Sequence, residues 1–239
     1  MSLQGLPPRS LILACDGGTA NFERIVGATC DLPEVGAYKI GARLALSDGL
    51  SAVVRKARQL TTKPLIYDHQ KAGTEAPNTA AGFMATLVDS GVDAVILIPF
   101  AGPDSQMTWT RAAIERGLTT LVGAHMSLPD FLNEDGGYVP RSSVDRIYGL
   151  AAASGVRDFV VPGNDLEAIS RIRSIVDGAV DEATYYAPGF VLQGGSISEV
   201  SRVAGDRWHA IVGRGVSERP DVRSAALALA EELGCRSSM

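Results

Sequence analysis

The chain has 239 residues, a formal net charge of −5 and 46% hydrophobic residues. This length suits one large α/β barrel or two smaller domains, and the apolar share is sufficient for a substantial core. The acidic balance, without a basic block, argues against nucleic acid or an anionic membrane as the main partner.

The cysteines and the hydropathy pattern indicate a cellular compartment. Cys15, Cys30 and Cys235 are scattered and odd in number, so we expect neither a disulfide framework nor a zinc site. No apolar run has the length of a membrane span. The N-terminus lacks the charged and apolar regions of a signal peptide. We therefore expect a cytoplasmic protein in a reducing environment, with no membrane partner.

Short apolar runs alternate with helical patterns along the whole chain. Apolar runs that end in turn residues predict buried parallel strands. The predicted strands are residues 11–15, 35–41, 65–67, 94–99, 120–123, 158–161, 185–189 and 209–212. The predicted helices are residues 22–28, 50–60, 79–89, 108–116, 144–154, 166–176, 197–204 and 222–233. A longer irregular piece is expected at 133–142.

Eight strand–helix units predict a single (β/α)8 TIM barrel over residues 1–239, with residues 1–9 as an N-terminal extension. Right-handed crossovers then place all the strand ends at one rim. The alternative is an open doubly wound sheet. That fold usually has fewer strands and a G-x-G-x-x-G fingerprint after the first one, which Asp16-Gly17-Gly18 does not supply.

Charged residues gather at the ends of the second and third predicted strands. Asp68, Lys71 and Glu75 follow the third strand, and Lys39 interrupts the apolar second strand. A buried ammonium needs an acidic partner, and Asp68 is the nearest candidate. A lysine kept protonated beside a carboxylate is suited to protonate a developing carbanion. The alternative interpretation is a surface salt-bridge cluster of little consequence.

Glycine-rich turns follow the seventh and eighth predicted strands, where this fold commonly binds phosphate. They read Gln193-Gly194-Gly195 and Gly213-Arg214-Gly215. Such turns expose backbone N–H groups, and Arg214 offers a fork-shaped cation for a phosphate dianion. The alternative is that these are simple turn glycines with a solvated arginine.

The three histidines show no spacing typical of metal ligands, so we expect no metal. We interpret His69 as a rim or turn residue, and His125 and His209 as packing or structural residues.

Six motifs, in order and at predicted strand ends, resemble those of the orotidine 5'-phosphate decarboxylase family, in its archaeal-like branch. They are Leu13-Ala14-Cys15-Asp16, Tyr38-Lys39-Ile40-Gly41, Asp68…Lys71…Glu75-Ala76-Pro77-Asn78-Thr79, Met126-Ser127, Ala187-Pro188-Gly189 with Gln193-Gly194-Gly195, and Val212-Gly213-Arg214-Gly215. The resemblance covers nearly the whole chain. It implies decarboxylation of orotidine 5'-monophosphate to UMP, the last step of de novo pyrimidine synthesis, without cofactor or metal.

The resemblance also implies roles for individual residues. Lys71 corresponds to the lysine that protonates C6, Asp68 to the aspartate beside the substrate carboxylate, and Lys39 to the lysine that links this aspartate to the ribose. The remaining substrate-binding positions are Asp16 for the ribose hydroxyls, Ser127 for the pyrimidine, and Gln193, Gly194, Gly213 and Arg214 for the phosphate. Glu75 and Thr79 fall where the family reaches into the neighbouring subunit's site, which implies a homodimer.

The third motif departs from the family's Asp-x-Lys-x-x-Asp. Here it reads Asp-x-x-Lys-x-x-x-Glu, with one extra residue in each gap.

Three alternative functions stay open. One is another phosphosugar lyase or decarboxylase of the same superfamily, whose members typically carry an acid on the second strand and use Mg²⁺. Another is a non-catalytic nucleotide-phosphate-binding barrel. The last is a Schiff base on Lys71, which protonation beside Asp68 and Lys39 disfavours.

Overall fold

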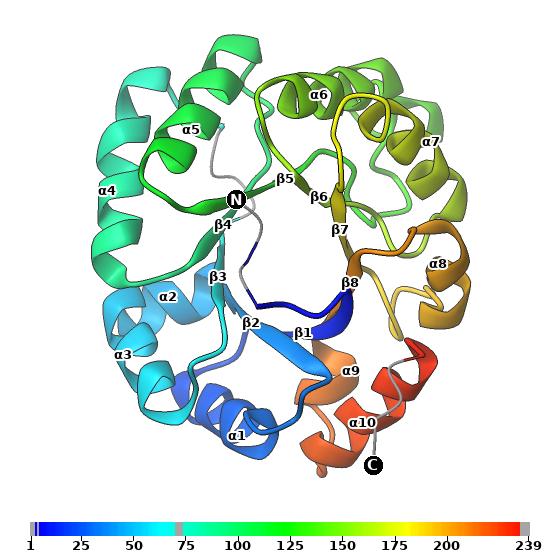
Figure 1. Ribbon diagram of the computed structural model, residues 1–239. Coiled ribbons are helices and arrows are strands. Elements are labelled where there is room, and N and C mark those ends of the chain that lie inside the picture. The colour runs from blue at the N-terminus through cyan, green and yellow to red at the C-terminus, as the bar shows by residue number, and fades with distance from the viewer. Residues whose placement is uncertain (1–2, 4, 70–73, 235–239) are drawn as a thin grey trace.

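The computed structural model describes residues 3, 5–69 and 74–234. Its strands are all parallel and pair in chain order to form a closed barrel, which the helices surround (Figure 1). The strands are β1 (Arg9–Cys15), β2 (Val35–Gly41), β3 (Leu65–Asp68), β4 (Ala94–Leu97), β5 (Thr119–Gly123), β6 (Asp158–Val160), β7 (Thr184–Pro188) and β8 (Trp208–Val212). The predicted single (β/α)8 barrel is confirmed.

The outer layer consists of helices that follow the strands in turn. They are α1 (Thr19–Thr29), α2 (Ala42–Asp48), α3 (Leu50–Leu60), α4 (Ala80–Ser90), α5 (Pro103–Glu115), α6 (Arg141–Ala153), α7 (Leu166–Val176), α8 (Ile197–Val203), α9 (Arg214–Ser217) and α10 (Val222–Glu232). The described loops also contain the 3₁₀ turns η1 (Pro77–Thr79) and η2 (Asn133–Asp135). Within the described ranges, none of the helices is both long and apolar enough to cross a membrane.

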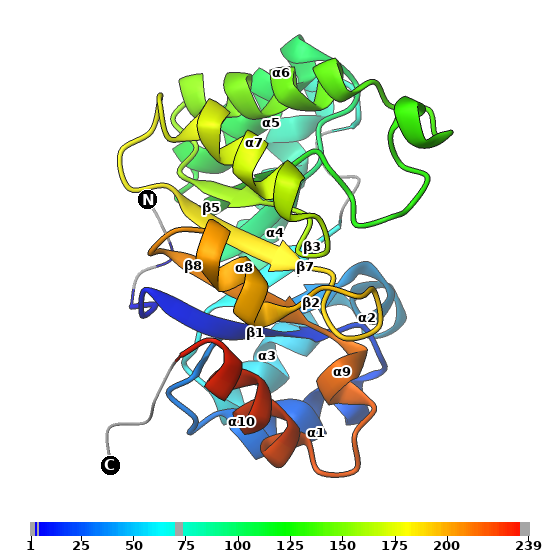
Figure 2. The same ribbon diagram turned by 90° about the vertical axis from the view of Figure 1, so that its right-hand side faces the viewer.

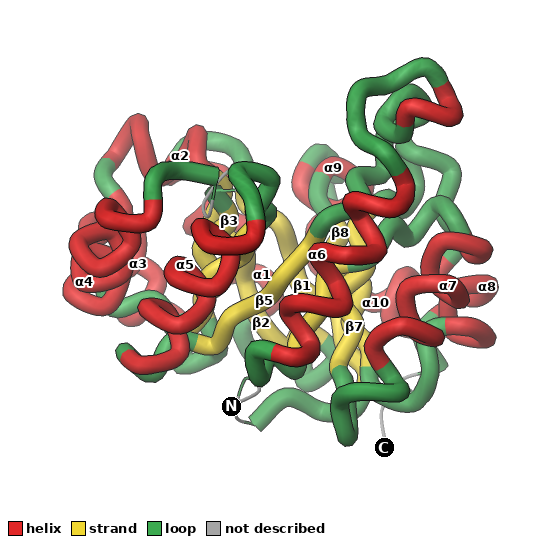
Figure 3. Tube along the Cα trace, turned by 90° about the horizontal axis from the view of Figure 1, so that it is seen from above, coloured by secondary structure: helices red, strands yellow, loops and turns green. Residues whose placement is uncertain are grey.

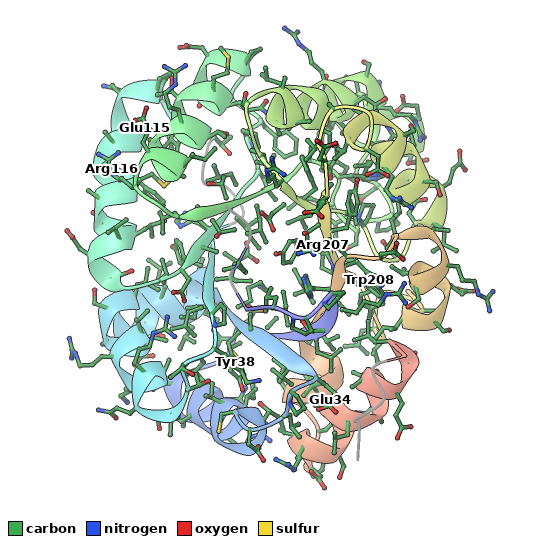
Figure 4. All side chains as sticks on the ribbon, viewed as in Figure 1. Glu34, Tyr38, Glu115, Arg116, Arg207 and Trp208 are labelled. Carbon is green, nitrogen blue, oxygen red and sulfur yellow. The ribbon has the colours of Figure 1, made fainter. Side chains whose placement is uncertain are left out.

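Two apolar layers hold the barrel together, because successive strand side chains point to opposite faces. In β1, Ile12 and Ala14 belong to the cluster inside the barrel, whereas Leu11 and Leu13 belong to the layer beneath the helices. On β2, Tyr38 lies on the side facing α1 (Figure 4), and its hydroxyl is 2.9 Å from the hydroxyl of Thr29. Both faces of each strand are buried, which explains the continuous apolar runs in the sequence.

The two ends of the barrel differ. The helices α2 and α9, which begin directly after β2 and β8, lie at the end toward which the strands point (Figures 2 and 3). The segment that contains η2 projects from the same end (Figures 2 and 3). Near the start of β1, Leu3 is 6% exposed and belongs to the interior cluster. Leu3 therefore helps to close the end of the barrel from which the strands start, while the opposite end carries the loops of the candidate site.

Several predicted boundaries were wrong. The helices α2 and α9 were not predicted, α5 begins five residues before the predicted residue 108, and β4 ends at Leu97. The predicted irregular piece at 133–142 contains η2 and the first residues of α6. The first strand begins at Arg9, inside the predicted extension. Pro103 at the first position of α5 explains its early start, because proline is favoured there and its missing N–H has no helical partner to lose.

Buried polar residues of β1, β6, β7 and β8 form a cluster. The Tyr186 hydroxyl donates to Oδ1 of Asp158 at 2.8 Å, and Oγ of Ser10 lies 2.8 Å from Nδ1 of His209. Burial raises the pKa of Asp158 to about 6 and lowers the pKa of His209 to about 3. His209 is 2% exposed, which confirms its structural interpretation.

Asp158→Asn should become more stable relative to the wild type as the pH rises from 4 to 7. The pKa of Asp158 is raised from 3.8 to about 6 on folding, so its stabilising contribution is present below pH 4 and is lost as the pH rises through 6. A shift of about two pKa units corresponds to roughly 3 kcal/mol. Urea unfolding at several pH values measures this difference. The contribution of His209 to the pH dependence largely cancels, because both proteins contain this residue. A difference that is independent of pH would contradict the prediction.

Candidate active site

A cavity of about 330 Å³ opens among the loops at the C-terminal ends of the strands. Residues from all the strands, β1 to β8, and from the loops that follow β1, β4, β5, β7 and β8 line it. Its polar members include Asp16, Lys39, Asp68, His125, Ser127, Gln193 and Arg214. The volume is within the range of small-molecule sites, and this end of the barrel is where the fold performs chemistry.

Lys39 occupies one side of this cavity and joins two carboxylates. Its Nζ lies 2.7 Å from Oδ2 of Asp68 and 3.2 Å from Oδ1 of Asp16. The Lys39 and Asp68 side chains are 8% and 6% exposed, whereas Asp16 is 58% exposed. The predicted pairing of Lys39 with Asp68 is therefore present, and a second acid, Asp16, joins the cluster.

Strand register explains why these three side chains meet. In the β1–β2 pair Ala14 is opposite Lys39, and in the β2–β3 pair Gly41 is opposite Asp68. A Cβ atom on Gly41 would lie 2.0 Å from Oδ1 of Asp16, so only glycine leaves room for that carboxylate. The acid after β1 can therefore turn toward Lys39.

Burial and charge act in opposite directions on Lys39. Burial alone would lower the pKa of the ammonium, but the attraction of Asp68 and Asp16 and their hydrogen bonds outweigh it, so the pKa is raised. Lys39 therefore stays protonated and keeps a fixed positive charge between the two acids. A group of this kind orients carboxylates and is a poor base or nucleophile.

The loops after β5 and β7 meet on another side of the cavity. The Ser127 hydroxyl donates to Oε1 of Gln193 at 3.3 Å, and Nε2 of Gln193 donates to the Ser127 carbonyl at 3.3 Å. Gly189 adopts φ +113°, a left-handed conformation that glycine allows, and a Cβ there would approach Ser127 to 3.2 Å. The glycine therefore permits the close contact of these two loops.

The short helix α9 begins directly after β8, with Gly213 as its N-cap residue and Arg214 as its first residue. A short extra helix after strand eight, together with the loops after strands seven and eight, is the common phosphate site of this fold. Gly213, Arg214 and Gln193 all line the cavity. The arrangement is suited to a phosphorylated ligand whose other end reaches Lys39.

The cavity brings together most of the predicted site residues, but not all. Asp16, Lys39, Asp68, Ser127, Gln193, Gly213 and Arg214 line it. Gly194 is in the β7–α8 loop with φ +83°, outside the lining formed by the described residues. Glu75 and Thr79 are exposed and also lie outside that lining. Lys71 lies outside the described residues.

Sequence reasoning missed the apolar part of the site. Its members are Ile96, Ile98, Val160, Ile211, Met126, Phe190 and Leu192. His125 also lines the cavity; its ring stacks on Phe131 with centroids 5.5 Å apart, and burial lowers its pKa. The two-residue alternation in 94–98 was an available signal for Ile96 and Ile98, whereas the contacts of the loop residues depend on loop conformation.

Two residues that neighbour site residues in the sequence, Cys15 and His69, have packing and hydrogen-bonding roles. Burial raises the pKa of the Cys15 thiol to about 12, so it lacks the thiolate character of a nucleophile. His69 lies at the rim, as interpreted from the sequence: its Nδ1 is 2.5 Å from the Tyr67 hydroxyl, and its ring meets Phe83 edge-on. Among the described side chains, no group of three His, Cys, Asp or Glu residues is placed to hold a metal ion. The expected absence of a metal stays a prediction.

The fold and this cavity define a class of protein. Its members are (β/α)8 barrels with a lysine–carboxylate centre and with glycine-containing turns suited to phosphate after β7 and β8. The family model described as "Orotidine 5'-phosphate decarboxylase / HUMPS family" matches residues 9–229. The chain therefore belongs to this family.

Individual relatives agree with this assignment. The chain is similar to the orotidine 5'-phosphate decarboxylase of Methanosarcina barkeri, with 32% identity over 93% of this chain and 94% of that protein. The corresponding enzyme of Methanosarcina mazei is 32% identical over 83% and 84% of the two chains. Among solved structures, the Pyrococcus horikoshii orotidine 5'-phosphate decarboxylase superposes with a TM-score of 0.76 at 25% identity, covering 95% of this chain and all of that one.

A further structure is that of the Methanocaldococcus jannaschii enzyme complexed with inhibitor BMP. It superposes with a TM-score of 0.82 and covers 94% of this chain and 98% of that one. Its sequence identity of 23% makes this a likeness of fold.

Proposed function

We propose that this protein decarboxylates orotidine 5'-monophosphate to UMP without a cofactor. The observation that carries the proposal is the buried Lys39 between Asp68 and Asp16, in the same cavity as Arg214 and Gln193. The lysine–carboxylate cluster offers fixed charges for a reacting carboxylate and a ribose. Arg214 and the glycine turn after β8 offer a cation and backbone N–H groups for a phosphate.

In the proposed reaction, the bond between C6 and the carboxylate breaks, CO₂ leaves, and the electron pair stays on C6. The Lys71 ammonium then supplies the proton that C6 accepts. Asp68 is assigned to the side of the departing carboxylate, where its negative charge disfavours the substrate more than the product. The apolar wall, with Ile96 and Ile98, lowers the local dielectric constant and strengthens these interactions.

The charge on Lys39 favours a metal-free decarboxylase over the related Mg²⁺-dependent lyases. The family description also covers HUMPS proteins. The resemblance drawn from the sequence implies that superfamily members that use Mg²⁺ typically carry an acid on the second strand. Here β2 carries Lys39, whose raised pKa favours the charged ammonium. A cation at this position would repel a divalent metal, so metal-assisted chemistry is the less favoured alternative.

The assay is decarboxylation of orotidine 5'-monophosphate, followed by absorbance, with and without EDTA. We expect turnover that EDTA does not reduce. UMP binding without turnover would favour the non-catalytic barrel, and turnover that requires Mg²⁺ would favour a metal-dependent lyase. The expected cytoplasmic location is part of the same proposal, and cell fractionation tests it.

We also propose that the active unit is a homodimer in which Glu75 and Thr79 serve the neighbouring subunit's site. Both residues are exposed, and neither contributes to the lining of its own cavity as the described residues form it. They nevertheless lie beside the rim, in the segment between β3 and α4. A second copy that packs on this rim would bring each Glu75 to the other subunit's cavity.

Glu75→Ala and Lys71→Ala are therefore expected to complement each other. Each variant alone should have little activity. A mixed dimer contains one site with both substitutions and one unaltered site, so co-expression should restore about one quarter of wild-type turnover if subunits pair at random. Glu75→Ala that is nearly fully active by itself, or a mixture as inactive as its components, would contradict the shared site.

A further inference from the structure

Residues 74–77, which include Glu75 and precede α4, lie beside the loop from β4 to α5. The two loops border a common surface hollow of about 350 Å³, lined by residues 74–77 and 101–105. A loop that carries a functional carboxylate needs a defined path, because an exposed loop is otherwise among the most mobile parts of a protein.

Two hydroxyl groups connect these loops at consecutive positions. The Thr74 hydroxyl donates to the carbonyl of Ile98 at 2.9 Å. The Ser105 hydroxyl donates to the carbonyl of Glu75 at 2.7 Å. Ile98 is 6% exposed and Ser105 is 4% exposed, so both bonds end on well-packed parts of the molecule.

The partners at the far ends of these bonds have fixed positions. Ile98 follows β4 directly and belongs to the cluster inside the barrel, where it also lines the candidate active site. Ser105 lies in the first turn of α5, a helix of 13 residues whose N-cap is Gly102. The bonds therefore transmit the rigidity of the barrel and of α5 to the main chain at residues 74 and 75.

Both bonds act on the backbone and leave the Glu75 carboxylate available. In the first bond, the donor is Thr74, the residue before Glu75. In the second bond, the acceptor is the main-chain carbonyl of Glu75. They set the position of the Cα atom from which the carboxylate projects. At the other end of the segment, the 2.5 Å contact between the Tyr67 hydroxyl and Nδ1 of His69 holds the chain where it leaves β3.

We propose that Thr74 and Ser105 are positioning residues, which hold the main chain at residues 74 and 75 so that Glu75 reaches its working position. The inference rests on the proposed function. A displacement of about 1 Å of a catalytic group can reduce a rate about 100-fold, whereas a hydrogen bond of this kind contributes only modestly to folding. Loss of either hydroxyl should therefore affect turnover much more than stability.

The test compares Thr74→Val and Ser105→Ala with matched controls on exposed helix surfaces, Thr86→Val and Ser170→Ala. The control hydroxyls bond only within their own helices, to the carbonyls of Gly82 and Leu166. We expect kcat to fall about 10- to 100-fold in the two loop variants, with the UMP dissociation constant within about twofold of wild type. Thr74→Ser and Ser105→Thr should recover most of the activity, since they keep the hydroxyl.

Amide hydrogen exchange supplies a readout that does not need turnover. Exchange in residues 74–79 should accelerate at least about tenfold in the loop variants and stay unchanged in the controls. Unchanged exchange would overturn the proposal, and so would faster exchange with an unaltered kcat. A wild-type protein that binds UMP without turnover would instead contradict the proposed function, and the exchange comparison would still decide whether the two bonds hold the segment.

Discussion

Lys71→Ala should reduce kcat for orotidine 5'-monophosphate by at least about 100-fold, and by as much as about 10⁴-fold, the range typical of a general acid. The Lys71 side chain is the proposed proton donor to C6, and alanine cannot supply the proton that the electron pair on C6 accepts. The UMP dissociation constant should stay close to the wild-type value, because phosphate and ribose recognition are assigned to Arg214, Gln193 and Asp16. Steady-state kinetics and calorimetric titration with UMP measure the two effects separately.

Lys56→Ala is the matched control for this experiment. Lys56 forms an exposed ion pair with Glu23 at 3.1 Å, on the outer surface of the barrel. Its removal deletes one positive charge from the protein without altering the cavity. If Lys71→Ala retains turnover near that of Lys56→Ala, another residue donates the proton. If both turnover and UMP binding disappear in Lys71→Ala, loss of the folded site is the explanation.

Lys39→Met is expected to destabilise the protein by about 3–5 kcal/mol, the cost of removing one partner of a buried ion pair. Methionine has a comparable length, so the main change is loss of the ammonium. The Asp68 carboxylate, 6% exposed, would lose its 2.7 Å contact with Lys39, and Asp16 would lose its own. Activity should fall as well, because the two acids no longer have a fixed cation between them. Urea unfolding at pH 7 measures the stability difference.

Lys56→Met provides the comparison for this second prediction. It removes the same charge from a pair whose side chains are 49% and 44% exposed. Exposed pairs contribute about 0–1 kcal/mol, so the difference between the two variants isolates the effect of burial. Equal destabilisation by Lys39→Met and Lys56→Met would show that the central cluster is as weak as a surface ion pair.

The sequence by itself determined the architecture. Strand β2 and helices α3 and α7 have the predicted bounds, and the strands were located because parallel strands with two buried faces read as apolar runs. The placement of Asp16, Lys39 and Asp68 at one rim also followed from the sequence, since the right-handed crossover puts all strand ends on the same side. The six motifs at the strand ends then indicated the family to which the chain belongs.

Only the tertiary structure decided which groups meet at that rim. Lys39 contacts acids 23 and 29 residues away, and Ser127 bonds to a glutamine 66 residues away. These pairings depend on strand register and barrel closure, which local patterns do not encode. The short helices α2 and α9 were missed for a related reason: helices of seven and four residues are too short to be stable alone, so their formation depends on packing against the barrel. The hydrogen bonds of Thr74 and Ser105 belong to the same category, because two separate loops must first be brought side by side.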